Sequence, residues 1–197
     1  MIKLLCFRVP FMINRRVIIS FALISLAGCV SNPLNRVTSD RYSETCSVAE
    51  RHGNLGVAEE ACYRALVNTY WGNLGDELKS EKLYNLARIK RQLSKFSEAE
   101  SLLEQSLEIE EARSEVVNEK IGRRLVELSI NLAAMGRWEE GALSLERVVP
   151  IADQYSGSEK DTIIMVFIEY GKHFSQSEQE KKANQFISQA RNLQRNK

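Results

Sequence analysis

The side chains best suited to catalysis or metal binding in this 197-residue chain are two histidines, His52 and His173, and four cysteines. Neither histidine belongs to a visible Ser/His/Asp or Cys/His set, so we interpret both as helix-end or surface residues. The sequence has no glycine-rich phosphate loop, no paired-cysteine zinc spacing and no His-Glu-x-x-His motif. The acidic run at residues 98–111 is typical of a solvated helix face. We therefore expect a protein that is not an enzyme, with no catalytic residue, no metal ligand and no cofactor.

One of the cysteines, Cys29, follows a short apolar segment. Residues 17–27 carry no charge and come directly after Arg15 and Arg16. A helix that spans a bilayer needs about 20 apolar residues, so this segment is too short to do so. A basic start, an apolar middle and small residues at the end predict a secretory signal peptide over residues 1–28. The alternative is a buried amphiphilic helix with an incidental cysteine.

The sequence Leu26-Ala27-Gly28-Cys29 resembles the lipobox of bacterial lipoproteins. That resemblance implies cleavage between Gly28 and Cys29, a lipid on the Cys29 thiol and acylation of the new amino terminus. A thiolate is nucleophilic enough to take such a lipid, and three acyl chains would hold the mature protein on a membrane. Because Val30 and not Asp follows the cysteine, the resemblance implies an outer-membrane anchor with the protein facing the periplasm, if the source is Gram-negative.

The segment behind the cysteine is polar and contains an Asn-Pro turn signal, so we interpret residues 29–38 as a lipidated tether. Translation from Met12 would give a more ordinary signal peptide than translation from Met1. The sequence leaves both starts open.

The net charge of +1 combines two unlike parts of the chain. Of 27 basic residues, four lie in the first 28 positions, which contain no acid, so 23 basic residues face 26 acidic ones in the remainder. A protein that binds nucleic acid without sequence preference needs a basic surplus to replace counterions on phosphates. The composition therefore excludes that class of partner.

From residue 39 onward the sequence repeats an amphipathic helical pattern with a period of about 42 residues. Small residues recur in pairs twelve positions apart, flanked by large apolar residues; the pairs are Cys46 with Ala58, Ala87 with Ala99, Ser129 with Gly141, and Gly171 with Ala183. Gly53, Ser94 and Gly136 lie between the two helices of the first three repeats. The pattern predicts a stack of antiparallel helical hairpins whose helices approach closely at the small residues.

The segments 131–141 and 167–171 resemble tetratricopeptide (TPR) repeats, and residues 96–109 resemble the longer repeat of kinesin light chains. The resemblance covers residues 39–195. It implies an all-α, right-handed superhelix of about four antiparallel hairpins, a TPR-like solenoid that forms one domain over residues 39–197. Pro150 lies within the second helix of the third repeat and predicts that this helix kinks or ends early.

Two cysteines, Cys46 and Cys62, face the same seam in the aligned repeats. An exported protein meets an oxidising compartment, which favours a disulfide between them. The alternative is a pair of reduced, buried thiols.

In the TPR family the first helix of each repeat lines a concave groove that receives peptides or partner helices. Alignment gives this role to nine residues: Tyr84, Arg88, Arg91, Val126, Ile130, Ala133, Met165, Ile168 and Lys172. Such a groove has a basic rim and an apolar floor, which suits an amphipathic segment with some acidic residues. The alternative is that Val126, Ile130 and Ile168 pack against the next repeat.

Together these features predict an outer-membrane lipoprotein that acts as a periplasmic adaptor or assembly factor and binds another protein or a peptide segment. A pilotin-like lipoprotein of secretion or pilus assembly is an alternative within this class. An enzyme or small-ligand-binding protein on the same scaffold is an alternative from another class, and an enclosed pocket with several ionisable groups would favour it. A third possibility is a structural module whose groove is closed by self-association.

Overall fold

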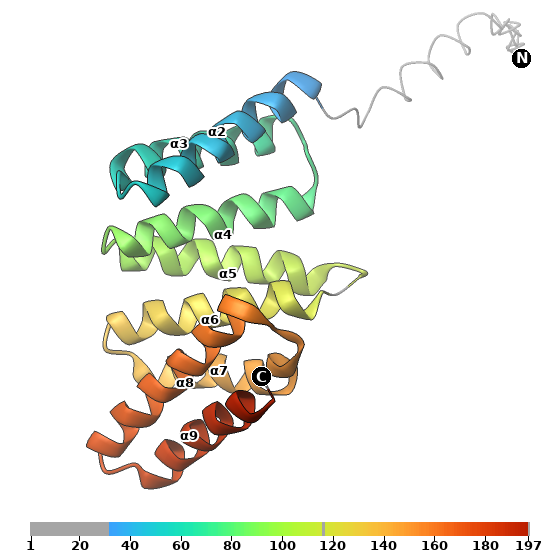
Figure 1. Cartoon of the computed structure of the whole chain (residues 1–197). Helices are drawn as coiled ribbons and strands as arrows, with labels where there is room; N and C mark the ends of the chain where they lie inside the picture. The colour runs from blue at the N-terminus through green and yellow to red at the C-terminus, as the bar shows by residue number, and fades with distance from the viewer. Residues whose placement is uncertain (1–31, 116, 197) are drawn as a thin grey trace, which may run out of the picture. The chain divides into compact units, whose positions relative to one another are not determined.

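The computed structural model describes residues 32–115 and 117–196, and all regular secondary structure in this part is helical. The elements are α2 (Pro33–Arg51), α3 (Leu55–Trp71), α4 (Asp76–Gln92), α5 (Phe96–Ala112), α6 (Asn118–Ala134), α7 (Trp138–Val148), the 3-10 helix η1 (Val149–Gln154), α8 (Gly157–Gln176) and α9 (Glu180–Arg195). The α-helices form four antiparallel hairpins, α2/α3 to α8/α9, that stack in chain order (Figure 1). The predicted all-α solenoid of four hairpins is confirmed.

The predicted signal peptide (residues 1–28) and the predicted lipid site, Cys29, lie outside the described residues. Within the part that the structure describes, we find no helix whose length and hydrophobicity would let it cross a bilayer.

The first helix begins earlier than the sequence analysis predicted. The Asn32 side chain accepts a hydrogen bond from the Leu34 amide at 3.0 Å, and Pro33 occupies the first helical position. A proline there loses no helical hydrogen bond, and its fixed φ suits the first turn. The Asn-Pro pair is therefore a helix start and not a turn. The tether predicted over residues 29–38 is wrong for residues 33–38, and the repeat domain begins before residue 39.

Each hairpin turns at a residue with positive φ: Gly53 (71°), Ser94 (59°), Gly136 (77°) and Glu178 (59°). The next amide then donates to the carbonyl five residues earlier, as from Asn54 to Ala49 and from Arg137 to Leu132, both at 2.9 Å. This bond closes the C-terminus of the first helix of each hairpin. The sequence predicted the first three turns but not the fourth, because Glu178 is not a residue typical of a positive φ. Hydrogen bonds around Glu178 hold its backbone in the left-handed region.

The predicted small residues lie in the seams between paired helices, and all eight are buried. The apolar columns beside them are buried as well, with Leu83, Leu125 and Phe167 from the first helices and Leu103 and Leu145 from the second. The core is therefore a series of seams joined end to end, as stacked repeats require.

At two glycines of the third hairpin, the space that a side chain would occupy is filled by a tyrosine. The Tyr170 hydroxyl donates to the Ser129 carbonyl at 2.7 Å, and a Cβ atom at Gly141 would lie 1.8 Å from that hydroxyl oxygen. The Tyr155 hydroxyl likewise donates to the Glu119 carbonyl at 2.6 Å, 2.0 Å from where a Cβ at Gly122 would lie. Burial raises the pKa of both tyrosines, that of Tyr155 to about 12. These bonds tie α8 and the segment after η1 to the third hairpin.

We predict that Gly141→Ala lowers the free energy of unfolding by about 1–3 kcal/mol, because the new methyl group displaces the Tyr170 ring. Urea denaturation measures the loss. Adding Tyr170→Phe removes the nearest clashing atom, so the double variant should be more stable than Gly141→Ala alone. Gly56→Ala is the matched control, since a Cβ there meets nothing within 4 Å. Equal stabilities for Gly141→Ala and Gly56→Ala would contradict this account of the seam.

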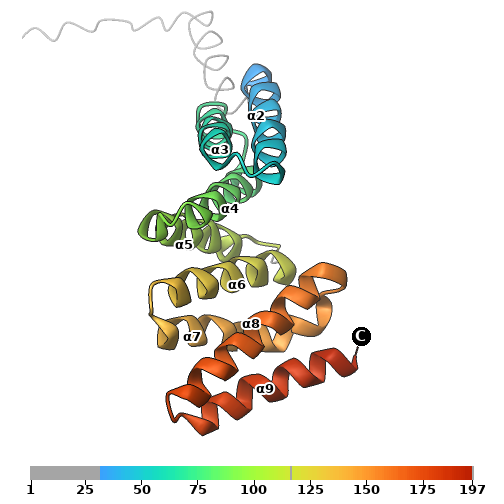
Figure 2. The ribbon, with the colours of Figure 1, turned by 60° about the vertical axis from the view of Figure 1, so that its left-hand side comes forward.

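Pro150 ends α7 early, as predicted. α7 has 11 residues, against 17 in α3 and in α5, and residues 149–154 continue as η1. A proline has no amide to donate and its ring clashes with the carbonyl four residues before it. The break returns the chain toward α6, and α8 then runs obliquely to α6 in both views (Figures 1 and 2).

Candidate binding groove

An open groove of about 360 Å³ lies between α4, α6 and the beginning of α8. Its lining comes from three helices and from Tyr155, which follows η1. It combines aromatic, aliphatic and charged side chains: Tyr84, Arg88 and Arg91 of α4, Arg123, Val126, Glu127 and Ile130 of α6, Tyr155, and Glu159, Thr162 and Ile163 of α8. The groove therefore exists only where the second, third and fourth hairpins are stacked.

The structure brings five of the nine predicted groove residues to this lining: Tyr84, Arg88, Arg91, Val126 and Ile130. The other four, Ala133, Met165, Ile168 and Lys172, are not part of it. Ala133 and Ile168 are half-buried against the core, while Met165 and Lys172 are exposed. The alignment failed at α8 because it assumed an unbroken repeat, whereas the wall is made by the first two turns of α8, at Glu159, Thr162 and Ile163.

The arginines of the groove are all paired with glutamates. Arg88 binds Glu50 of α2 at 2.7 Å, Arg91 binds Glu127 of α6 at 2.5 Å, and Arg123 binds Glu159 of α8 at 2.8 Å; each pair links the first helices of neighbouring hairpins. The predicted basic rim is thus compensated within the chain. An acidic partner must exchange its carboxylates for these glutamates, so charge attraction contributes less than an unpaired rim would.

Three aliphatic side chains and one aromatic ring lie at the floor of the groove, between its charged side chains. Val126 and Ile163 are buried and Ile130 is half-buried. Two guanidinium groups lie over the Tyr84 ring, Arg124 at 4.9 Å and Arg88 at 5.9 Å from its centroid. Burial, and then the charge of Glu127, raise the pKa of the Tyr84 hydroxyl. The phenol therefore stays neutral and offers an aromatic face.

Arg124, which the sequence analysis did not single out, holds the groove floor in place from behind. It is buried and donates to Ser80 Oγ at 3.1 Å and Ser106 Oγ at 3.0 Å, and it forms an ion pair with buried Glu110 at 3.3 Å. These bonds tie α6 to α4 and α5. The sequence contains one sign of this role: a basic residue, Lys82, stands 42 residues earlier at the same repeat position. In the structure Lys82 is buried too.

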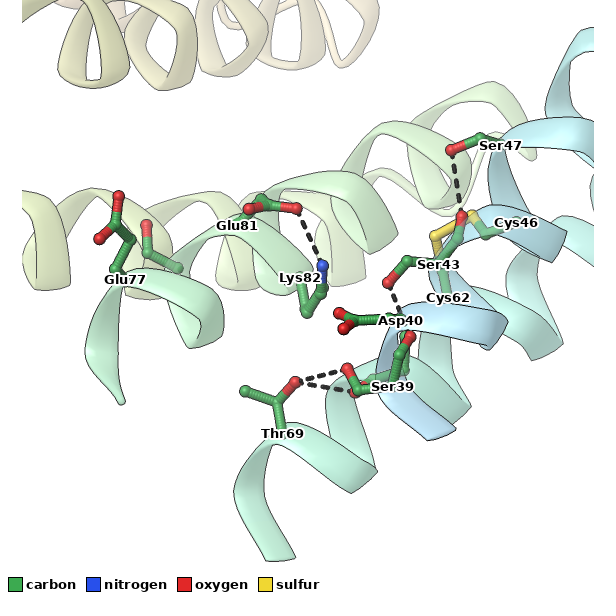
Figure 3. A network of polar contacts seen from close by, with 12 residues as sticks. Ser39, Asp40, Ser43, Cys46, Ser47, Cys62, Thr69, Glu77, Glu81 and Lys82 are labelled. Atoms are coloured by element: carbon green, nitrogen blue, oxygen red, sulfur yellow. Dashed lines mark hydrogen bonds and ion pairs between the residues drawn. A yellow bond between two sulfur atoms is a disulfide. The ribbon is translucent and has the colours of Figure 1, made fainter. Parts of the chain in front are cut away.

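A disulfide joins Cys46 of α2 to Cys62 of α3, with an S–S distance of 2.04 Å and a Cα–Cα distance of 5.2 Å. Figure 3 shows it beside a polar cluster in which Ser39 Oγ and Thr69 Oγ1 lie 2.9 Å apart. The rest of this seam is built largely from small side chains, with Ala49, Ala58, Ala61 and Ala65 all buried. The covalent link therefore closes the hairpin that has the least bulky core.

We predict that replacing both cysteines, Cys46→Ala with Cys62→Ala, lowers the free energy of unfolding of the first hairpin by about 3 kcal/mol, as expected for a closed loop of some 15 residues. Amide hydrogen exchange should show faster opening of α2 and α3 than of α6. A reductant should destabilise the native protein and leave the double variant unchanged. Intact mass measurement that finds two free thiols at these positions in the purified protein would contradict the disulfide.

The histidines lie away from the groove. His52 ends α2, where its Nδ1 lies 2.8 Å from the Val48 carbonyl, and His173 stacks on Trp138 with ring centroids 4.0 Å apart. Among the described residues no group of three or more His, Cys, Asp or Glu side chains could hold a metal ion.

Comparison with known proteins identifies the fold. No protein-family model matches the chain, and no curated protein matches it by sequence. The crystal structure of BtubC (BKLC) from P. vanneervenii is similar over 81% of this chain, with a TM-score of 0.70 and 20% identity, and this chain spans 64% of its length. A putative kinesin light chain of P. anserina with TPR-like repeats is similar over 88% of this chain and 81% of its own, with a TM-score of 0.62 and 22% identity. The chain therefore has a TPR-like repeat fold.

Proposed function

We propose that this protein is a lipid-anchored adaptor of the bacterial cell envelope that binds a segment of another protein in the groove between α4, α6 and α8. The observation that carries the proposal is the groove itself, open and floored by Val126, Ile130 and Ile163, on a fold built to present such surfaces. An amphipathic helix or extended segment can bury its apolar face there.

The charges of the groove favour a partner with spaced acidic residues. Arg91 and Arg123 each face a glutamate of the same groove, so a partner carboxylate can take over a guanidinium while Glu127 or Glu159 turns to solvent. Such exchange adds little affinity but selects against basic segments, which would meet three arginines. In this proposal the aliphatic side chains at the floor contribute most of the affinity, and the arginines fix the position of the bound segment along the groove.

A binding role accounts for the groove better than catalysis does. Its carboxylates, Glu127 and Glu159, form ion pairs with Arg91 at 2.5 Å and with Arg123 at 2.8 Å, so both already serve as contacts between neighbouring hairpins. The lining contains no cysteine, serine or histidine that could act as a nucleophile or proton carrier. We infer that the protein is not an enzyme.

The proposed place of action is supported by residues 26–29, which resemble a lipobox, and by Val30 behind them. A disulfide between Cys46 and Cys62 fits an exported protein, because the periplasm is oxidising. We infer an outer-membrane anchor through Cys29, with the helical repeats in the periplasm.

The groove is tested by photocrosslinking in cells. A benzoylphenylalanine at Tyr84 keeps an aromatic ring in the groove and should capture one protein, and so should the same residue at Ile130. Leu143 and Met165 are the matched controls, since both are exposed and lie outside the lining, with 64% and 63% of their surface accessible.

Adding Val126→Asp should reduce capture at Tyr84 at least tenfold, because a charge on the floor repels an apolar segment. Adding Leu143→Asp should leave capture unchanged. Capture that is equal at groove and control positions, or that survives Val126→Asp, would show that this groove is not the binding site.

The anchor is tested by metabolic labelling with an alkyne fatty acid. Cys29→Ser should abolish labelling, and Cys6→Ser should retain it, because only Cys29 can become the lipidated amino terminus. Mass spectrometry of the amino-terminal peptide should find acylated Cys29 as the first residue. An amino terminus before residue 29, or an unmodified Cys29, would refute the anchor.

A further inference from the structure

Among the residues that the structure describes, one face of the first hairpin packs against no other hairpin. α2 and α3 lie at one end of the hairpins, and α4 packs against one side of them only (Figures 1 and 2). On that inner side Glu50 binds Arg88 of α4. On the opposite side Arg64 donates to the Tyr42 hydroxyl at 3.1 Å, across the outside of the seam. We call the side with Arg64 the outer face.

The outer face carries a row of apolar residues from both helices. On α2 the row is Leu34, Val37 and Val48, with Arg41 and Thr45 between them, and on α3 it is Val57, Arg64 and Trp71, spaced seven residues apart. These spacings place each set on one side of its helix. Val48 and Val57 line one shallow hollow, which shows that the two rows share a face.

The exposure of these apolar residues is unusual for the end of a repeat stack. Trp71 is 79% exposed and Leu34 is 75% exposed. Of nine large exposed hydrophobic residues in the described ranges, five lie on this face. An end repeat in a soluble solenoid needs a polar outer face, and α9 at the other end keeps its apolar residues Phe186, Ala190 and Leu193 buried.

The apolar end of this face lies where the chain enters the first hairpin. The Asn32 amide donates to the Gly72 carbonyl at 3.1 Å, so Asn32 is held beside the residue that follows Trp71. Only Val30 and Ser31 lie between Cys29 and Asn32 in the sequence, so three residue steps join them. A chain of that length spans at most about 10 Å. A lipid on Cys29 would therefore bring Trp71 and Leu34 within reach of the headgroups.

We propose that the outer face of the first hairpin docks on the surface of the phospholipid bilayer, with Trp71, Leu34 and Val37 in the interfacial zone and Arg41 and Arg64 toward the phosphates. This inference rests on the proposed lipid anchor at Cys29. Tryptophan favours the membrane interface, and arginine snorkels toward headgroups. The anchor supplies the high local concentration that lets a small patch of this kind bind.

A bilayer fits this face better than a second copy of the chain does. The exposed apolar residues are separated along the face by Arg41 and by the Arg64–Glu60 ion pair at 2.6 Å. Two copies packed face to face would bury these charges against one another, whereas a headgroup layer keeps them hydrated. Docking in this way leaves the groove between α4, α6 and α8 on the side of the first hairpin that faces away from the membrane.

The test uses two single-tryptophan versions of the full chain, processed in a Gram-negative host and placed in nanodiscs of phosphatidylcholine and phosphatidylglycerol. Trp138→Phe leaves Trp71 as the reporter, and Trp71→Phe leaves Trp138 as the matched control. Acyl chains brominated near the headgroup quench only a tryptophan that touches lipid. We expect a loss of Trp71 emission, with its maximum shifted to shorter wavelength, and no loss for Trp138.

Hydroxyl-radical footprinting of the unsubstituted protein in the same discs gives a second measurement that needs no variant. Trp71 and Leu34 should lose reactivity relative to the protein after delipidation, while Leu143 and Met165 should keep theirs. Acylated Cys29 together with unquenched, fully reactive Trp71 would overturn docking and leave the adaptor function standing. An amino terminus without lipid would overturn the anchor and docking together. In either case the crosslinking at Tyr84 is judged separately.

Discussion

Every hairpin depends on the close approach of two helices at one pair of small side chains. Ala87 with Ala99 is the simplest example, since neither side chain has any exposed surface. A larger residue at such a point would hold the helices apart and open voids beside the leucines that flank the pair. The approach also explains why Tyr170 can reach the Ser129 carbonyl over Gly141, because only a residue without a side chain leaves room for the hydroxyl.

A second level of order links one hairpin to the next through charges. Glu59 pairs with Lys90 and Lys95, Glu100 pairs with Arg137, and Glu139 pairs with Lys182, each time from the second helix of a hairpin toward the next hairpin. A lysine at position 90, where a large apolar side chain is usual, is accommodated because Glu59 and Glu98 flank it. Ion pairs that remain in contact with solvent contribute little energy singly. These ion pairs fix the register of neighbouring hairpins, because an offset of one helical turn would separate the oppositely charged side chains.

Most of the fold could be predicted from the sequence because it repeats. The seam residues, the turns at Gly53, Ser94 and Gly136, and the end of α7 before Pro150 follow from periodicity and from the φ that each residue tolerates. The features that could not be predicted are those that occur in one repeat only and therefore leave no periodic pattern. Tyr155 lies in no repeat register, and Glu159, Thr162 and Ile163 face the groove only because η1 changes the approach of α8. Three groove positions on α8, Met165, Ile168 and Lys172, were misplaced for this reason, whereas Ala133 lies at the end of α6 and packs against the core. Glu178 was missed as a turn because its side chain gives no sign of a positive φ.

The interruption at Pro150 limits the positions along the stack at which a partner segment could bind. A stack of equivalent hairpins offers the same surface again at each step, so a long ligand could shift from one step to the next with little change in energy. Residues 149–155 remove that degeneracy, because only one interval of the stack, between α4 and the start of α8, has Tyr155 and Glu159 as a wall. Under the proposed function, the repetitive scaffold therefore offers one distinct binding position, and we expect one bound segment per chain.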